Sequence, residues 1–397
     1  MGDENSVTLP YGNREIELRI PAGRRKVVGM HKAQTGDEPL QAFESALDSP
    51  VDCPSLKKLT VGRKVSFLLD DATRSEPHAA CMKACLPRLR KAEQVSAIIT
   101  TGSHEVQSEG NRRLLEQFRV VASALGDRAR IHIHDCHKED RMADLGRTPR
   151  GTPVIADRSA LDSDVFVVAS DMKNHYFAGY SNALKNFLPG VCGYPSIEAN
   201  HALALDSRST FGHHPWHPDP GRRTNPVAGD MLDACRMIVG PRPVFVLASI
   251  TADQAVLWTA AGEMRAVVKE GICEVDRRTG VRVPTFSRVI VSPGGHPQDE
   301  SLYNAQRGME LAKNCVRDGG EALLLAACSR GVAPTEKARQ NFYDRLTAPL
   351  PRVLKGLRER YVLYSHKAHK FAELLQRIEA LHLHSELPEE TVDRKSV

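Results

Sequence analysis

The sequence predicts an α/β fold of two domains, in which a mainly parallel, Rossmann-like sheet forms the N-terminal domain. A chain of 397 residues is longer than one compact core usually accommodates. Short apolar runs alternate with longer amphipathic stretches, as strands alternate with helices, and a second such alternation begins near residue 284. We therefore expect a catalytic, cofactor-binding α/β domain over 1–283 and a smaller α/β domain with a C-terminal helix over 284–397. The active site is expected in the cleft between them.

The strands of the first domain are predicted from short, β-branched apolar runs. Each run is followed at once by polar or ionisable side chains, as at the end of a buried strand. A strand, a helix and a second strand in this order predict a parallel pair. The expected strands are 65–69, 95–100, 130–134 and 165–169, and the expected helix is 80–91.

The second domain is predicted to begin with a strand that runs into a turn rich in glycine and proline. This turn, Pro293–Pro297, precedes a helical pattern that we expect Gly319 and Gly320 to close. Residues 210–225 are expected to form a loop between helices. The other expected elements are strands over 288–292 and 322–327, a helix over 302–317 and a helical tail over 364–383.

Composition and charge argue against several classes of protein. The 54 basic and 49 acidic residues give a net charge of +5 and are spread along the chain, whereas nucleic-acid binders gather their basic residues in a patch. Nine cysteines without a Cys-x-x-Cys pair favour a reducing compartment. The apolar runs are far shorter than the ~20 residues of a membrane helix, and Met1–Ser6 does not resemble a secretory signal. We expect a cytoplasmic protein that binds a small molecule, and neither nucleic acid nor membranes. These features do not predict its oligomeric state.

Ionisable side chains stand where each predicted strand of the first domain ends. Ligands of open α/β sheets bind just beyond the carboxyl ends of the strands, so these side chains are expected to converge on one cleft. They are Asp70, Asp71, Arg74, His104, His134, Asp135 and Asp171.

Two of these strand ends have both a functional and a structural explanation. In Asp70-Asp71-Ala72-Thr73-Arg74, the guanidinium suits a carboxylate or a phosphate, because it can make two parallel hydrogen bonds. The alternative is an aspartate N-cap of the next helix with a solvated arginine. In Thr101-Gly102-Ser103-His104, the imidazole can act as acid or base near neutral pH, although a loop histidine is more often a surface residue.

The stretch after residue 171 holds the strongest candidates. It places His175 and Lys185 around a turn bounded by glycines, and His201 follows. A lysine in a confined turn can lose its proton and tether an electrophilic cofactor; the alternative is a plain surface lysine of a helix. Gly179–Ala183 nearly fits Gly-x-Ser-x-Gly, so a serine hydrolase that uses Ser181 is a second interpretation, although no His-Gly-Gly-Gly segment accompanies it.

Other histidines favour structural roles. The segment His213–Asp219 has three imidazoles but also two prolines and no cysteine, so we favour a polar loop over a metal site. His132 and His134 share one face of a strand, and one of them is expected to be a structural group. Neither a P-loop motif nor a dinucleotide-binding fingerprint is found in the sequence.

The spacing of His175, Lys185 and His201 resembles the signature of the nickel-dependent lactate racemase family. Lys185 follows His175 by ten residues, and His201 follows Lys185 by sixteen. Further blocks, in the same order as in that family, extend the resemblance over most of the chain. They are Asp71-Ala72-Thr73-Arg74, Thr101-Gly102-Ser103-His104, His134-Asp135, Gly151-Thr152-Pro153-Val154, Gly294-Gly295-His296-Pro297 and Tyr303-Asn304-Ala305.

The resemblance implies an isomerase, a racemase or epimerase of a 2-hydroxy acid. Its cofactor would be a nickel-pincer nucleotide, the Ni(II) complex of pyridinium-3,5-bisthiocarboxylic acid mononucleotide, made by dedicated biosynthesis enzymes. Lys185 would tether this cofactor and His201 would bind the nickel, for which imidazole is a suitable ligand. His104 and His175 would be the base and acid of a reversible hydride transfer through a 2-keto acid. The resemblance further assigns Asp71, Thr73, Ser181 and Pro189 to the cofactor, and Arg74, Tyr303, Asn304 and Arg307 to the substrate.

The chain departs from the family pattern in two places, one expected to contact the cofactor and the other expected to contact the substrate. Asn182 and Ala183 stand where the family has two glycines, and side chains there could crowd a cofactor. Tyr303-Asn304-Ala305-Gln306-Arg307 replaces Tyr-Gln-Ala-x-Lys, and the tryptophan expected near the C-terminus is missing. We therefore expect a hydroxy acid larger or more polar than lactate. A homologue that binds a ligand without this cofactor is the third interpretation.

Overall fold

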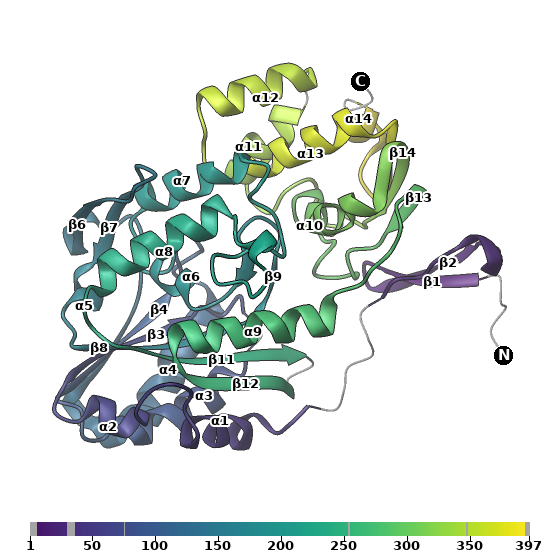
Figure 1. The fold of residues 1–397 in the computed structure, drawn as a ribbon. Helices are drawn as coiled ribbons and strands as arrows, with labels where there is room; N and C mark the ends of the chain where they lie inside the picture. Colours follow the sequence, from purple (N-terminus) through teal and green to yellow (C-terminus); the bar gives the residue numbers. More distant parts are fainter. Residues whose placement is uncertain (1–5, 30–35, 75, 253–254, 347, 394–397) are drawn as a thin grey trace. The chain divides into compact units, whose positions relative to one another are not determined.

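The computed structural model describes residues 6–29, 36–74, 76–252, 255–346 and 348–393 (Figure 1). The chain divides into two compact units. The large unit is Met30–Gly280, and the small unit joins Met1–Gly29 to Val281–Val397.

A six-stranded sheet forms the centre of the large unit, with the strand order β12-β11-β8-β3-β4-β5. All neighbours pair in parallel except β12, which is antiparallel to β11. The mainly parallel sheet expected from the sequence is thus confirmed. Its strands are β3 (Lys64–Asp70), β4 (Gln94–Thr100), β5 (Ala129–Ile133), β8 (Val165–Asp171), β11 (Val244–Ala252) and β12 (Ala255–Glu263).

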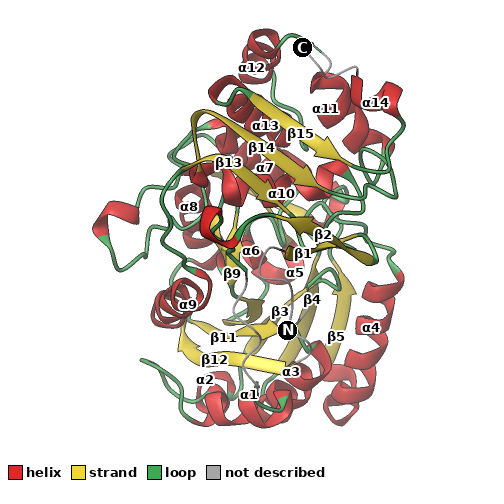
Figure 2. Cartoon of the chain, turned by 90° about the vertical axis from the view of Figure 1, so that its right-hand side faces the viewer, coloured by secondary structure: helices red, strands yellow, loops and turns green. Residues whose placement is uncertain are grey.

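The middle strands are apolar because helices cover both faces of the sheet. Every residue of β8 is buried, as is usual for a parallel strand between two helical layers. On one face, Phe67 and Val167 pack in a single core with Phe43 and Met82, and Figure 2 shows the helices on that side. On the other face, the ring of Phe166 packs edge-on against Phe187, at 5.3 Å between centroids. The helices of this unit are α1 (Pro39–Asp48), α2 (Leu56–Thr60), α3 (His78–Cys85), α4 (Glu109–Val121), α5 (Arg158–Leu161), α6 (Leu184–Phe187), α7 (Tyr194–Ala202), α8 (Pro226–Val239) and α9 (Met264–Thr279).

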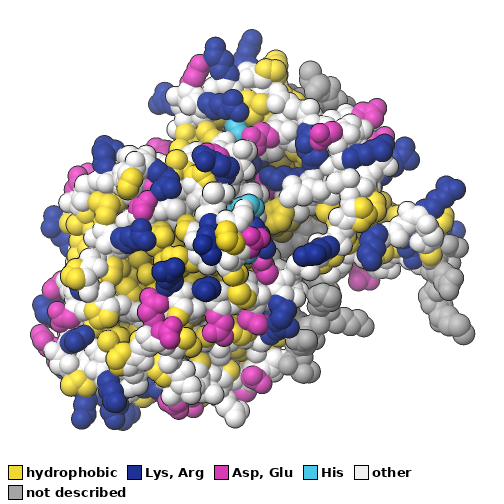
Figure 3. Space-filling model, in the orientation of Figure 1, with side chains coloured by type: hydrophobic (Ala, Val, Ile, Leu, Met, Phe, Trp, Pro, Cys, Tyr) yellow, Lys and Arg dark blue, Asp and Glu magenta, His cyan; other side chains and the backbone are white. Residues whose placement is uncertain are grey.

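Two hairpins and a long loop complete the large unit. The hairpins are β6 (Met142–Arg147) with β7 (Pro153–Asp157), and β9 (Lys173–His175) with β10 (Gly179–Ser181). Residues 210–225 lie between α7 and α8 and contain only the short turn η6 (Pro220–Arg222), which confirms the predicted loop. On the face in Figure 3, basic and acidic side chains of this unit are interspersed, in line with their even spread along the sequence. No helix within the described ranges is both long and apolar enough to cross a membrane.

The small unit is built on a parallel sheet of order β13-β14-β15 and a separate hairpin, β1–β2. Its strands are β1 (Ser6–Tyr11), β2 (Arg14–Arg19), β13 (Phe286–Val291), β14 (Val316–Leu325) and β15 (Ala380–His384). Its helices are α10 (Leu302–Ala312), α11 (Glu336–Leu346), α12 (Leu350–Glu359), α13 (His366–Arg377) and α14 (Glu389–Asp393).

The hairpin β1–β2 groups with the C-terminal segment, whereas the sequence analysis places it in a domain over 1–283. The reason is a small apolar cluster in which Tyr11 packs with Leu325 and Ala327. Alternating polar and apolar residues in the hairpin predict a strand, but they do not predict which distant strand completes its core. We keep the expected boundary between residues 283 and 284 as a proposal, and we further propose that the β1–β2 hairpin belongs to the C-terminal domain.

Two helix predictions in the small unit are wrong at their ends. Helix α10 ends at Ala312, not at Arg317, and Gly319 and Gly320 lie inside β14. A Cβ on Gly320 would lie 2.9 Å from the carbonyl oxygen of Ser287, so the glycine allows a close approach of two strands. The predicted tail helix ends at Arg377, because the alternating Leu381 and Leu383 continue as β15 beside β14.

Candidate active site

The ends of β3 and β4 bring together an aspartate and a histidine. Nδ1 of His104 lies 2.7 Å from Oδ2 of Asp71, whose other oxygen accepts a 2.6 Å hydrogen bond from Thr73 Oγ1. The Asp71 side chain is buried, whereas 44% of the His104 side chain is exposed. The alternative that these aspartates cap the next helix is wrong, because α3 has Pro77 at its N-cap.

Asp71 is ionised, and it fixes the proton of His104. Burial raises the pKa of Asp71, but the hydrogen bond and charge of His104 and the hydroxyl of Thr73 outweigh it, so the pKa is lowered. An ionised carboxylate only accepts hydrogen bonds. Nδ1 of His104 must therefore carry the proton, which leaves Nε2 as an available base.

The turn that carries His104 packs on the segment that carries Lys185. The amide of Gly102 donates a 3.2 Å hydrogen bond to the carbonyl of Gly190. A Cβ on Gly102, whose φ is +54°, would lie 3.1 Å from Pro189. The glycine is thus required both by its left-handed backbone and by this contact. Pro189, which the resemblance assigns to the cofactor, contacts the His104 turn.

Lys185 is half-buried on α6 rather than on an exposed helical face. Burial and the neighbouring charge of Arg74 lower its pKa to about 7, although the carboxylate of Asp171 opposes them. A large share of this amine is therefore neutral and nucleophilic at physiological pH.

His201 is a neutral imidazole in the same region. Burial lowers its pKa to about 3, and Lys185 and His104 lower it further when they carry a charge, while a hydrogen bond to the backbone of Ile197 opposes them. A neutral imidazole is the form that binds a transition metal.

His175 and His201 both contact the ring of Phe177. The centroid distances are 4.6 Å to His175 and 5.3 Å to His201, with both pairs edge-on. Nδ1 of His175 accepts a 3.2 Å hydrogen bond from the amide of Ala178. His175 and His201 thus contact one phenylalanine ring, and the turn of His104 packs on the segment that carries Lys185.

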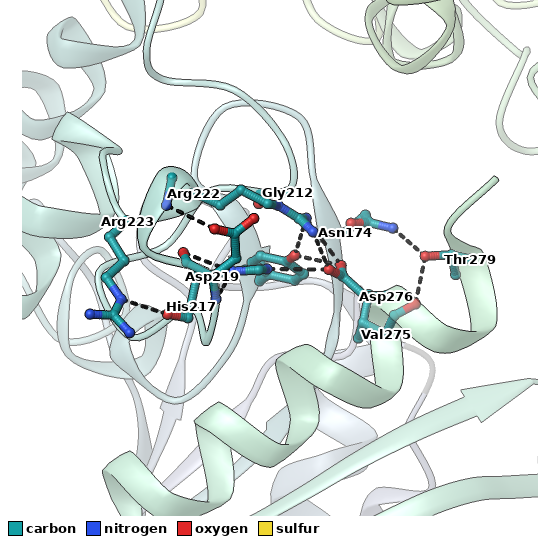
Figure 4. Close-up of polar contacts among 11 residues, drawn as sticks. Asn174, Gly212, His217, Asp219, Arg222, Arg223, Val275, Asp276 and Thr279 are labelled. Atoms are coloured by element: carbon teal, nitrogen blue, oxygen red, sulfur yellow. Dashed lines mark hydrogen bonds and ion pairs between the residues drawn. The ribbon is translucent and has the colours of Figure 1, made fainter. Parts of the chain in front are cut away.

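A polar network holds the hairpin that carries His175 (Figure 4). The hydroxyl of Tyr180 donates to Asp276 at 2.5 Å and accepts a 2.8 Å hydrogen bond from Arg222. Nε2 of His217 lies 3.2 Å from the same carboxylate. The histidine-rich loop thus contributes to an ion network, and no group of three or more metal-ligating side chains is found in the described part of the chain. The sequence did not indicate that Asp276 has this role, because a single aspartate in an amphipathic helix is normally an exposed surface residue.

Charged and polar side chains surround the buried carboxylate of Asp171. Oδ1 of Asp171 accepts a 2.7 Å hydrogen bond from Ser181, and Lys173 forms an ion pair with the same carboxylate. Burial lowers the pKa of Arg74, but the carboxylates of Asp171, Asp70, Asp71 and Glu76 outweigh it and raise that pKa. Arg74 therefore keeps its charge, and a substrate carboxylate would compete with acidic neighbours for it. Ser181 donates to an aspartate rather than to a histidine base, so this geometry does not support a serine hydrolase.

Asn182 has a structural use in this chain. Its Oδ1 accepts a 2.9 Å hydrogen bond from the amide of Leu184, its Nδ2 donates to the carbonyl of Tyr180 at 3.1 Å, and Nδ2 lies 3.4 Å from Nε2 of His214. Burial lowers the pKa of His214 to about 3, so that imidazole can accept a hydrogen bond. The side chain that replaces a glycine therefore stabilises the start of α6.

His134 behaves as a structural histidine. It is completely buried, with Nδ1 at 3.3 Å from Asp157 and Nε2 at 3.0 Å from the carbonyl of Cys192. His132 lies 3.1 Å from the same Asp157 carboxylate. Neither histidine belongs to the group around Lys185.

The remaining predicted residues lie on α10 of the small unit. The Tyr303 ring packs edge-on against Phe342 at 5.5 Å, and Asn304 donates a 3.2 Å hydrogen bond to Glu300. Arg307 is exposed. Lys367 on α13, which the sequence analysis missed, has its Nζ 3.8 Å from the centroid of the Tyr303 ring. The sequence did not indicate that Lys367 is buried, because a lysine in an amphipathic helix normally points into solvent.

These features define an α/β enzyme in which a lysine of lowered pKa, a neutral imidazole and an Asp–His pair lie in the unit built on the parallel sheet. Residues 11–212, just over half of the chain, match the family model of the lactate racemase N-terminal domain. The chain belongs to this family, and it is an isomerase.

Relatives agree with this family assignment. The lactate racemase of Thermoanaerobacterium thermosaccharolyticum is 25% identical over 336 residues, which cover 82% of this chain and 75% of that protein. The lactate racemase of Lactiplantibacillus plantarum is 25% identical over 334 residues, which cover 82% and 76%.

Solved structures share the fold. The apoprotein of the Thermoanaerobacterium thermosaccharolyticum lactate racemase matches with a TM-score of 0.83 and 22% identity, over 98% of this chain and 91% of that one. A Thermotoga maritima protein matches with a TM-score of 0.61 and 14% identity, over 92% of each chain.

Proposed function

We propose that this protein is a cytoplasmic racemase or epimerase of a 2-hydroxy acid that uses a nickel-pincer nucleotide tethered to Lys185. The observation that carries the proposal is the pairing of an amine of pKa about 7 with a neutral imidazole, His201, in one site. The relatives named as lactate racemases support the reaction class.

The side chains of the site suit such a cofactor. Tethering through a thioamide needs a neutral amine, which Lys185 supplies near neutral pH. Nickel needs a deprotonated ring nitrogen, and His201 is held neutral. When bound, the cofactor would supply a hydride acceptor, so that a 2-hydroxy acid could pass through a planar 2-keto acid.

The protein's own residues would move the hydroxyl proton. In our proposal, Nε2 of His104 takes this proton from one enantiomer, because Asp71 holds the other ring nitrogen as a donor. His175 returns a proton on the opposite side, and the two histidines exchange roles for the other enantiomer. Asp71 stabilises the imidazolium that forms on His104, as a buried carboxylate does in other Asp–His pairs.

Other residues would bind the ligands. Asp71, Thr73, Ser181 and Pro189 keep their proposed place beside the cofactor, although Asp71 and Thr73 also orient His104, and Ser181 is bonded to Asp171. Arg74, Tyr303, Asn304 and Arg307 are proposed to bind the substrate. Asn304 and Arg307 depart from the family pattern, so we propose a hydroxy acid larger or more polar than lactate. The enzymes that make the cofactor are the proposed partners.

Intact mass and nickel analysis test this proposal. The chain is co-expressed with the cofactor biosynthesis enzymes, and we expect a covalent adduct, close to one nickel per chain, and racemisation of a 2-hydroxy acid from a panel. Lys185→Arg should lose the adduct, whereas Lys173→Arg, in the neighbouring ion pair, should retain it. Absence of both adduct and nickel from the wild type would overturn the proposal and favour a cofactor-free homologue. Labelling of Ser181 by a serine reagent with metal-independent activity would favour a hydrolase.

A further inference from the structure

Helix α7, which carries His201, is anchored in the large unit by two polar side chains. Of the residues buried on this helix, only Ile197 is apolar, and the others are Ser196 and Asn200. Ser196 accepts a 3.0 Å hydrogen bond from the amide of Ile155 on β7. Asn200 contacts α8, which lies beside α7 (Figure 1). Apolar packing has no preferred direction, whereas hydrogen bonds do, so these two contacts set the rotation of α7 about its axis.

The partner of Asn200 is Asp230, a completely buried aspartate of α8. Nδ2 of Asn200 donates to Oδ2 of Asp230 at 2.9 Å and to the carbonyl of Val227 at 3.3 Å. The Thr148 hydroxyl lies 2.5 Å from Oδ1 of Asp230. This hydroxyl must be the donor, because its oxygen already accepts hydrogen bonds from two backbone amides. Both oxygens of Asp230 therefore act as acceptors, which the side chain of an asparagine could not do.

No lysine or arginine forms an ion pair with Asp230 in the described part of the chain. Arg150, two residues after Thr148, pairs with Asp233 instead, at 2.6 Å. A buried carboxylate that has only neutral donors costs free energy, which apolar side chains at 200 and 230 would avoid. In some proteins such buried polar groups fix one arrangement of neighbouring helices.

The rotation of α7 decides where the imidazole of His201 lies. Ile197 and Asn200 are three residues apart and share the buried face of the helix, whereas His201 stands about 100° further around its axis. The His201 ring is edge-on to Phe177, at 5.3 Å between centroids, and it is hydrogen-bonded to the backbone of Ile197. A rotation of α7 would move this ring away from Phe177.

We propose that Asp230 is a positioning residue for His201, and that it acts through Asn200 and the rotation of α7. The inference rests on the proposed function, in which His201 binds nickel. The buried pair of Asp230 and Asn200 holds the helix, so that the imidazole keeps the place from which it binds the metal.

Labelling of the full-length protein without cofactor tests the position of His201. Diethyl pyrocarbonate modifies neutral imidazoles, and peptide mass spectrometry measures the rate at each histidine. His201 is only partly exposed, so Asp230→Ala and Asn200→Ala should each raise its labelling rate about threefold or more by loosening α7. Asp233→Ala, on the same helix as Asp230, is the matched control and should keep the wild-type rate. His382, whose side chain is 59% exposed, is the internal reference.

Nickel release from the loaded protein tests the consequence for the metal. Loss of a residue that orients a metal ligand typically weakens metal binding tenfold or more, so Asp230→Ala and Asn200→Ala should each lose nickel to EDTA roughly tenfold faster than wild type. The adduct mass on Lys185 should be unchanged in both. Because the two residues act through one contact, the double variant should release nickel no faster than the faster single variant.

Thermal unfolding checks that each variant is folded, and Asn200→Ala carries the test if Asp230→Ala is not. Wild-type rates in either assay, an equal effect of Asp233→Ala, or additive effects in the double variant would each overturn the inference. If neither single variant folded, the pair would be purely structural and the inference would be wrong. A wild-type protein without adduct and nickel would refute the proposed function instead, and the labelling rates would then decide the role of Asp230.

Discussion

Nδ1 of His104 lies 2.7 Å from Oδ2 of Asp71, and the same carboxylate accepts a hydrogen bond from Thr73. A buried, ionised aspartate behind a half-exposed imidazole leaves Nε2 free to take a proton. The two residues come from loops after different strands, so only the parallel pairing of β3 and β4 brings them together.

Asp71→Asn should lower kcat strongly and change KM little. The amide can donate to Nδ1 of His104, which moves the ring proton to Nε2 and removes the base, at a cost of roughly 10²- to 10⁴-fold in kcat. Chiral chromatography of the reaction measures both constants. Asp144→Asn, at an exposed position of β6, is the control and should behave as wild type. An unchanged kcat in Asp71→Asn would show that His104 works without this aspartate.

Amine labelling of Lys185 should respond to pH near neutrality. Its pKa is lowered to about 7, mainly by burial, so it is mostly ammonium below this pH and mostly amine above it. For the cofactor-free protein we expect the acetylation rate to rise roughly 50-fold from pH 5 to pH 7 and to level off above pH 8. Mass spectrometry after brief treatment with acetic anhydride measures the rate. A rate still rising steeply between pH 9 and pH 10 would contradict the prediction.

Asp276→Asn should loosen the hairpin that carries His175. The aspartate binds Tyr180, Arg222 and His217, and loss of its charge should cost about 1–3 kcal/mol of unfolding free energy. Chemical denaturation measures this loss, and activity should fall with it. Asp162→Asn, which breaks an exposed ion pair with Lys64, should cost much less, because solvent screens such a pair.

The contribution of Asp276 to the free energy of unfolding should also depend on pH. Burial raises the pKa of Asp276, but the hydrogen bonds from Arg222, Tyr180 and His217 outweigh it, and the pKa is lowered in the folded protein. The stabilisation is therefore complete above the ordinary aspartate pKa of about 3.9 and is lost as the pH falls through the lower folded value. The stability difference between wild type and Asp276→Asn should be constant from pH 5 to pH 7 and shrink below pH 4. If the stability difference between wild type and Asp276→Asn instead grew as the pH was lowered, the prediction would be wrong.

Asn182→Gly should destabilise the protein and leave cofactor attachment unchanged. The Asn182 side chain bonds the Leu184 amide and the Tyr180 carbonyl, so its removal, with added backbone freedom, should cost about 1–2 kcal/mol. Denaturation measures the stability, and intact mass measures the adduct on Lys185. A large gain of adduct in Asn182→Gly would mean instead that the asparagine crowds the cofactor.

The elements that sequence patterns predicted well are those set by local periodicity. The buried runs at β3, β4, β5 and β8 are short, rich in β-branched residues and bounded by polar residues. Such runs predict strands even when the neighbouring strands in the sheet are not known. The pattern over 302–317 failed at its end because the strand β14 competes for Val316, which pairs with Phe286. Intrinsic helix propensity is too weak to resist such a distant contact.

The order of residues along the chain was enough to identify the parallel α/β fold, the family and the candidate group of His104, His175, Lys185 and His201. Those features depend on spacing and on the ends of strands, which are local. The tertiary structure alone decided that β12 runs antiparallel, that β1–β2 joins the C-terminal sheet, and that Lys367 lies over Tyr303. Each of these depends on burial between segments far apart in the chain, and the free energy of such contacts is not encoded in any short stretch of sequence.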